Sequence, residues 1–134
     1  MPARSPSVVA IRRACRSDAA EGTTRLLFVR DGGRIGLVQT PQETANDADQ
    51  FFALYLERMI TDVAAPAVVV AVHRAEGRPT YSDRQLWTML RARIEQTPVN
   101  LLDLVVVGAS RTWSARHGRP LSAGRRSASR AAAR

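Results

Sequence analysis

Two segments rich in valine constrain the fold of this chain more than any other feature. Residues 67–73 (AVVVAVH) and 101–108 (LLDLVVVG) carry mostly apolar side chains at successive positions, without a regular alternation of polar and apolar residues. This pattern is typical of strands that are buried on both faces of a sheet. A helix-length amphipathic stretch separates the two segments, so residues 67–108 predict a right-handed strand–helix–strand crossover.

A β-hairpin is expected ahead of this crossover. Residues 24–30 and 35–39 have the branched, apolar character of strands. The DGGR sequence at 31–34 between them predicts a tight turn, because glycine adopts positive φ without strain.

Two amphipathic helices are also expected. The first covers residues 51–63, where apolar residues recur at helical spacing, and Asp47 or Asp49 is a suitable N-cap. The second lies inside the crossover, where Ser82 is the expected N-cap and the apolar face extends to Ile94.

A short strand at 111–115 completes a predicted order of β-β-α-β-α-β-β. The expected fold class is α/β, with a mixed β-sheet flanked by helices, in one domain covering residues 23–115. Residues 1–22 are expected to form a flexible basic lead. Residues 116–134 are dominated by Ser, Ala and Arg, which predicts a disordered Arg-rich tail.

The positive charge is concentrated at the two ends of the sequence. The formal net charge is +8, and all 20 basic residues are arginine. Residues 1–17 contain four arginines and residues 116–134 contain six, and neither segment contains an acidic residue. These tails are expected either to contact nucleic acid non-specifically through its phosphates or to be a solvated surface that maintains solubility.

Cysteine usage and hydropathy indicate the compartment. The single cysteine, Cys15, cannot form an internal disulfide, which favours a reducing compartment such as the cytoplasm. No apolar run approaches the roughly 20 residues needed to span a bilayer, so no membrane association is expected.

The loop after the first buried strand carries the strongest functional signal. Residues 71–85 (AVHRAEGRPTYSDRQ) contain the turn-forming residues Gly77, Pro79, Thr80 and Ser82. They have the form of a strand that leads into a metal-site loop from which the metal ligands are missing.

The stretch from about residue 26 to residue 115 resembles the RadC-like JAB domain family, which is of the MPN or JAMM type. In the loop, the resemblance rests on Ala71 and the four turn residues. Downstream it rests on Leu101, Leu102, Asp103, the run 105–108, Arg111, Trp113 and Ser114. The resemblance implies a JAB/MPN-like fold and a relationship to zinc metallopeptidases and isopeptidases, in a family whose name is associated with DNA repair.

Active members of this family bind zinc through two histidines and an aspartate, and use an upstream glutamate as general base. In this chain the two histidine positions fall on Val72 and Arg74, and the aspartate position falls on Gln85. The glutamate position falls near Gln39, with Glu43 the nearest acid. The resemblance therefore implies a pseudoenzyme, a binding or structural module for an unknown protein partner, with no assigned catalytic residue and no expected cofactor.

A zinc-dependent hydrolase with atypical ligands is the alternative, and zinc would then be its cofactor. His73 and Asp83 are the weak candidate ligands, with Glu76 and Glu43 as further acids. No single shift of the alignment places two of the family's ligands at once, which argues against this alternative.

Arginines in the loop suggest a different kind of site. Arg74, Arg78 and Arg84 are expected either to bind an anion or to face solvent, paired with Glu76 and Asp83. A guanidinium beside a divalent metal would be repelled by about 4 kcal/mol per unit charge at 4 Å and an effective dielectric constant of 20.

Overall fold

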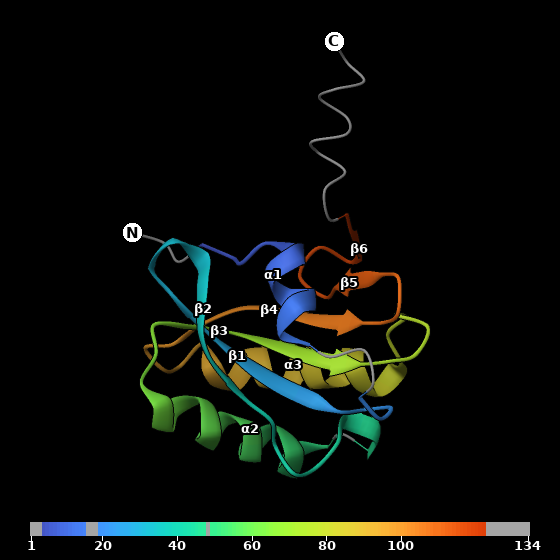
Figure 1. Ribbon diagram of the computed structural model, residues 1–134. Coiled ribbons are helices and arrows are strands. Elements are labelled where there is room, and N and C mark those ends of the chain that lie inside the picture. Colours follow the sequence, from blue (N-terminus) through green and yellow to red (C-terminus); the bar gives the residue numbers. More distant parts are fainter. Residues whose placement is uncertain (1–3, 16–18, 48, 123–134) are drawn as a thin grey trace.

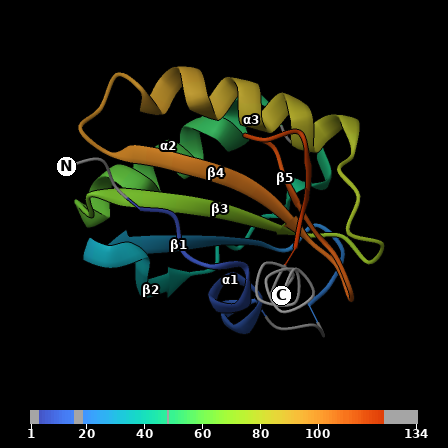
Figure 2. The ribbon, with the colours of Figure 1, turned by 90° about the horizontal axis from the view of Figure 1, so that it is seen from above.

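The computed structural model describes residues 4–15, 19–47 and 49–122. Within them a single six-stranded mixed sheet lies between helices on both faces, with the strand order β2-β1-β3-β4-β5-β6 (Figures 1 and 2). The elements are α1 (Val8–Ala14), β1 (Thr24–Arg30), η1 (Asp31–Gly33), β2 (Arg34–Gln39), η2 (Ala45–Asp47), α2 (Gln50–Val63), β3 (Ala67–His73), α3 (Tyr81–Ile94), β4 (Asn100–Val107), β5 (Thr112–Ser114) and β6 (Arg119–Leu121).

The predicted α/β class with a mixed sheet and flanking helices is confirmed, but the order of elements differs at both ends. Helix α1 precedes the predicted elements and strand β6 follows them, so the sheet contains one strand more than expected. None of the helices in the described part of the chain is long and apolar enough to cross a membrane.

Strands β1 and β2 form the predicted hairpin, and Gly32 and Gly33 in its turn have φ values of 77° and 79°. Strand β1 also pairs antiparallel with β3, which in turn pairs parallel with β4 across the α3 crossover. Helices α2 and α3 cover one face of the sheet and α1 covers the other (Figure 2).

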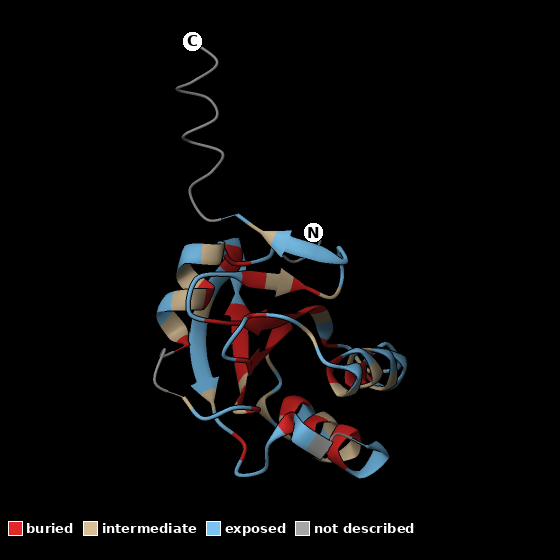
Figure 3. Ribbon diagram, turned by 90° about the vertical axis from the view of Figure 1, so that its right-hand side faces the viewer, coloured by how far each residue is buried: buried red, intermediate tan, exposed pale blue. Residues whose placement is uncertain are grey.

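The hydrophobic core has one layer on each side of the sheet. The layer against α2 and α3 includes Leu56 and Leu90 from the helices and Val70 from β3. The layer against α1 includes Ile11 and Val69. All seven residues of β3 are buried, which confirms that this strand has apolar neighbours on both faces (Figure 3).

The N-caps of α2 and α3 test two predictions made from the sequence. Asp49 caps α2 by accepting a hydrogen bond from the Phe52 N–H at 3.0 Å. Ser82 is not the N-cap of α3: Thr80 occupies that position, and Thr80 and Asp83 form a reciprocal capping box. The Thr-x-x-Asp spacing that supports this cap is a variant of the capping-box pattern and is visible in the sequence.

The prediction of a flexible lead over residues 1–22 is wrong for residues 4–15, which contain α1. The Arg12 guanidinium fixes this helix to the turn between β4 and β5. Arg12 donates hydrogen bonds to the carbonyl oxygens of Gly108 (2.9 Å), Ala109 (2.6 Å) and Arg111 (3.2 Å) and to Thr112 Oγ1 (2.9 Å). These tertiary contacts, together with the buried Ile11, order a helix too short to be stable alone.

The predicted disordered tail over residues 116–134 is also partly structured. Residues 119–121 form β6, which pairs antiparallel with β5. Residues 123–134 lie outside the described residues. Cys15, expected in a poorly ordered segment, is instead buried at the end of α1, and this burial raises the pKa of its thiol.

Replacing Arg12 tests whether α1 is held by its guanidinium. The Arg12→Gln variant should lower the free energy of unfolding by about 2 kcal/mol, because it removes several hydrogen bonds from a charged donor. Amide hydrogen exchange in α1 should become faster. Urea denaturation and exchange mass spectrometry measure these effects, with the exposed Arg13→Gln variant as a control that should change stability by less than about 0.5 kcal/mol. Equal effects of the two substitutions would contradict the assignment.

Candidate functional site

The candidate site lies where β3 ends and α3 begins. Arg74 directly follows β3, and its backbone N–H donates to the Val107 carbonyl oxygen at 3.1 Å. Its side chain reaches the first turn of α3, and the residue is only 4% exposed. A fully charged side chain is rarely buried this far unless it is paired.

Asp83 is the principal partner of Arg74. The Arg74 Nε donates to Asp83 Oδ2 at 3.0 Å and Nη2 donates to Oδ1 at 2.6 Å. This is the bidentate geometry in which a guanidinium and a carboxylate match best. Asp83 is fully buried, and its Oδ2 also accepts the Thr80 N–H at 2.9 Å. One carboxylate therefore both closes the first turn of α3 and binds the end of β3.

The remaining Arg74 donors bind two segments that lie far away in the sequence. Nη1 donates to Asn46 Oδ1 at 2.7 Å and to Glu21 Oε2 at 3.5 Å. Nη2 also donates to the Ala45 carbonyl oxygen at 3.2 Å. Glu21 accepts the Ala75 N–H at 2.9 Å through its other oxygen. The guanidinium thus connects the loop before β1, η2, β3 and α3.

The electrostatics of the site hold Arg74 in its charged form. Burial lowers the pKa of the Arg74 guanidinium, but the hydrogen bond and the charge of Asp83, followed by those of Glu21, outweigh burial and raise this pKa overall. The site therefore contains a permanent cation whose donors are directed at protein acceptors.

The positions that the sequence singled out as replaced ligands do not all converge. Val72 lies in the core layer beneath α2 and α3. Gln85 is half-buried on α3 and donates to the Tyr81 hydroxyl at 2.8 Å. Gln39 pairs with Leu26 in the edge strand β2, and β1 separates that strand from β3. Only Val72 and Arg74 share one side of the chain at the end of β3.

The weak metal candidates His73 and Asp83 are not brought together. Successive side chains of a strand point to opposite faces, so His73 lies on the α1 face of the sheet, whereas Asp83 lies under α3 on the other face. Glu43 and Glu76 are both exposed. In residues 4–15, 19–47 and 49–122, no group of three or more His, Cys, Asp or Glu side chains is arranged to hold a metal ion.

The three loop arginines occupy different environments. The expectation that Arg74 faces solvent is wrong, because Asp83 and Asn46 bind it in the interior. Arg78 is exposed, and the Arg84 guanidinium lies 5.4 Å from the centre of the Trp113 ring. As expected, Asp83 pairs with one of the three loop arginines, and that arginine is Arg74. Anion binding by Arg78 and Arg84 stays a prediction.

Glu21 and Asn46 were missed by sequence reasoning. Glu21 belongs to the segment predicted to be a flexible lead, and Asn46 lies between the predicted hairpin and the first predicted helix. Neither residue has a local pattern that signals a partner for Arg74. Only the tertiary structure brings these residues to the end of β3.

The loop between Arg74 and Thr80 is packed tightly against the turn after β4. Gly77 has a φ of 68°, and a Cβ atom at this residue would lie 2.8 Å from the Arg111 carbonyl oxygen. A Cβ at Gly108 would lie 2.4 Å from the Gly77 nitrogen. Both glycines are therefore required for the close approach of two backbone segments.

No protein-family model matches this chain, and no curated protein matches it.

A double-mutant cycle measures how strongly Arg74 and Asp83 depend on each other. Arg74→Met should lower the free energy of unfolding by about 3–5 kcal/mol, because it leaves the fully buried Asp83 without its counter-charge. Asp83→Asn removes the carboxylate charge that neutralises the buried Arg74 guanidinium, so it should also lower the free energy of unfolding. The double variant should lower the free energy of unfolding by less than the two single variants do in sum, and the difference should be at least about 1 kcal/mol.

The exposed ion pair of Arg93 and Glu57 is the matched control for this cycle. Its coupling energy should stay below about 1 kcal/mol, as in other surface pairs. Additive effects of Arg74→Met and Asp83→Asn in urea denaturation would contradict the interpretation of a mutually dependent buried pair.

Proposed function

We propose that this chain is a RadC-like JAB-domain protein that has lost catalysis and acts as a binding or structural module. The observation that carries the proposal is the state of Arg74. At a position where the resemblance implies a zinc-binding histidine, the chain has a buried guanidinium whose donors bind Asp83, Asn46, Glu21 and the Ala45 carbonyl oxygen.

The residues at the end of β3 do not fit a zinc ion. Zinc in proteins is held by imidazole, thiolate or carboxylate groups, and a catalytic site keeps one position open for water. Val72 offers no ligand atom, and Arg74 places a fixed positive charge beside the buried carboxylate of Asp83. The site thus lacks a means of lowering the pKa of a bound water.

The scaffold around this site supports the JAB-like assignment. The turn residues of the loop retain structural roles that do not need a metal: Thr80 caps α3, and Gly77 permits the close approach to Arg111. Asp103 and Ser114, which belong to the family resemblance, are hydrogen bonded to each other across β4 and β5. A retained framework with an ion pair at its metal position is what loss of catalysis in such a family would leave.

Zinc analysis tests this proposal. The purified chain should contain far less than one zinc per molecule by elemental analysis, because Arg74 already neutralises Asp83. The double variant Val72→His, Arg74→His puts imidazoles at the two family histidine positions, on the side of the chain where Asp83 supplies a buried carboxylate. It should bind about one zinc per chain, seen directly by elemental analysis and by the visible spectrum of a cobalt-substituted sample.

Two results would count against the proposal, and they are distinguishable. One tightly bound zinc in the wild-type chain would favour the alternative of a hydrolase with atypical ligands. A folded double variant that binds neither zinc nor cobalt would instead show that the end of β3 cannot form a zinc site, and the family resemblance would fail.

A further inference from the structure

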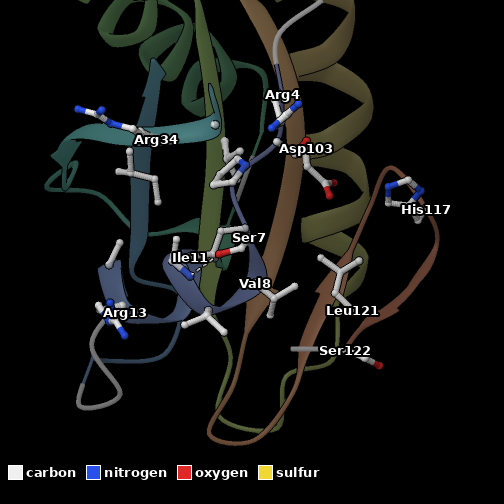
Figure 4. Close-up of a pocket in the computed structure, with 18 of the residues that line it drawn as sticks. Arg4, Ser7, Val8, Ile11, Arg13, Arg34, Asp103, His117, Leu121 and Ser122 are labelled. Atoms are coloured by element: carbon white, nitrogen blue, oxygen red, sulfur yellow. Dashed lines mark hydrogen bonds between the residues drawn. The ribbon is translucent and has the colours of Figure 1, made fainter. Parts of the chain in front are cut away.

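A large open groove lies on the face of the sheet opposite α2 and α3. Its volume is about 1310 Å³, and its walls are α1 with the segment before it, the η1 turn, and strands β2 and β6 (Figure 4). Typical sites for small ligands have volumes of roughly 300–1,000 Å³. A groove of this size and openness is better suited to a segment of a polymer.

The groove is lined by exposed arginines from four separate segments. Arg4 precedes α1, Arg13 lies on α1, Arg34 begins β2 and Arg119 begins β6. All four are exposed, and none of them takes part in the ion pairs formed within the described part of the chain. The neighbouring His117 also lines the groove (Figure 4).

The one acidic residue among the described lining residues is largely withdrawn from the groove. Asp103 is 7% exposed, and its carboxylate accepts hydrogen bonds from the Ser114 hydroxyl and from the Arg116 N–H. Burial raises the pKa of this carboxyl, although those hydrogen bonds act in the opposite direction. Among the described lining residues, the formal charge exposed in the groove is therefore that of the four guanidinium groups.

The folded structure explains how this concentration of charge arises. The described parts of the two acid-free arginine segments, residues 4–15 and 116–122, come together here, because Arg12 binds the turn that follows β4 and so places α1 beside β5 and β6. Arginines that are about 100 positions apart in the sequence, such as Arg13 and Arg119, thereby line one groove. The described residues of the two basic ends therefore lie on one surface of the domain.

The chemistry of the lining favours phosphate groups on a duplex. Guanidinium groups bind phosphate oxygens through paired, charge-assisted hydrogen bonds. Sites for single-stranded nucleic acid usually add aromatic side chains on which unpaired bases stack. None of the described lining residues is Phe, Tyr or Trp. A duplex keeps its bases stacked internally and needs only backbone contacts.

We propose that this groove binds the phosphate backbone of double-stranded nucleic acid without sequence preference, through Arg4, Arg13, Arg34 and Arg119. The proposal goes beyond the function proposed above and does not depend on Arg74. Contacts to phosphates position a protein on a duplex but carry no direct sequence information, so duplexes of different sequence should bind equally.

Fluorescence anisotropy with a labelled DNA duplex and the full-length chain tests the proposal. With four phosphate contacts, the slope of log K against log salt should be about −3 to −4, which corresponds to a roughly hundredfold loss of affinity between 50 and 200 mM salt. A duplex RNA should bind with similar affinity, and a single strand should bind more weakly.

Matched variants locate the binding surface. The triple variant Arg13→Gln, Arg34→Gln, Arg119→Gln should weaken binding at least about tenfold, whereas the corresponding lysine triple should retain most of it. The control triple Arg58→Gln, Arg91→Gln, Arg93→Gln removes the same charge from α2 and α3 and should stay within about twofold of wild type. Circular dichroism and thermal melting confirm that each variant is folded, and the three single groove variants replace the triple if it is not.

Three outcomes would overturn the proposal. One is unchanged binding by a folded groove triple. The second combines two results: full binding by the groove triple, and loss of binding when Arg125, Arg126, Arg130 and Arg134 are changed to Gln. Together these results would assign the interaction to the basic residues after β6. The third is binding to vesicles that contain phosphatidylserine, without any binding to duplexes.

Discussion

The buried pair of Arg74 and Asp83 is the interaction on which the arrangement around the loop depends. A charge with no partner in a protein interior costs several kcal/mol, so each of these groups is tolerated there because the other is present. Asp83 also closes the first turn of α3, and Arg74 directly follows β3. Glu21 and Asn46 bind the same guanidinium, so one cation connects β3, α3, η2 and the loop before β1.

This pair has a direct consequence for chemistry at the site. A metal ion in a hydrolase exchanges water and substrate at an open position, whereas a guanidinium whose donors are all directed at protein acceptors has no such position. The described contacts of the Arg74 guanidinium are all with acceptors of the protein itself. Under our proposal the chain therefore acts through its surfaces, and the groove beside α1, lined by Arg4, Arg13, Arg34 and Arg119, is the surface proposed to bind a partner.

Much of the sheet was predictable from sequence, because local patterns determine it. The run of apolar residues at 67–73 predicts a strand that is buried on both faces, and Gly32 and Gly33 predict the hairpin turn. Helix α1 could not be found in this way, because it is short and depends on bonds from Arg12 to a turn almost 100 residues away. The burial of Arg74 was missed for the same reason: its partners Glu21 and Asn46 are brought to it only by the tertiary structure. The spacing from Thr80 to Asp83 was a usable signal of the α3 cap.

Nitrogen-15 NMR of the Arg74 side chain, recorded with and without added zinc, tests the central claim most directly. A guanidinium held by Asp83, Asn46 and Glu21 should give Nε and Nη resonances that are separately resolved and protected from exchange with water. Equimolar zinc should leave these resonances unchanged. Averaged, rapidly exchanging resonances would show that the group is not fixed, and their displacement by zinc would show that a metal ion competes for the same place.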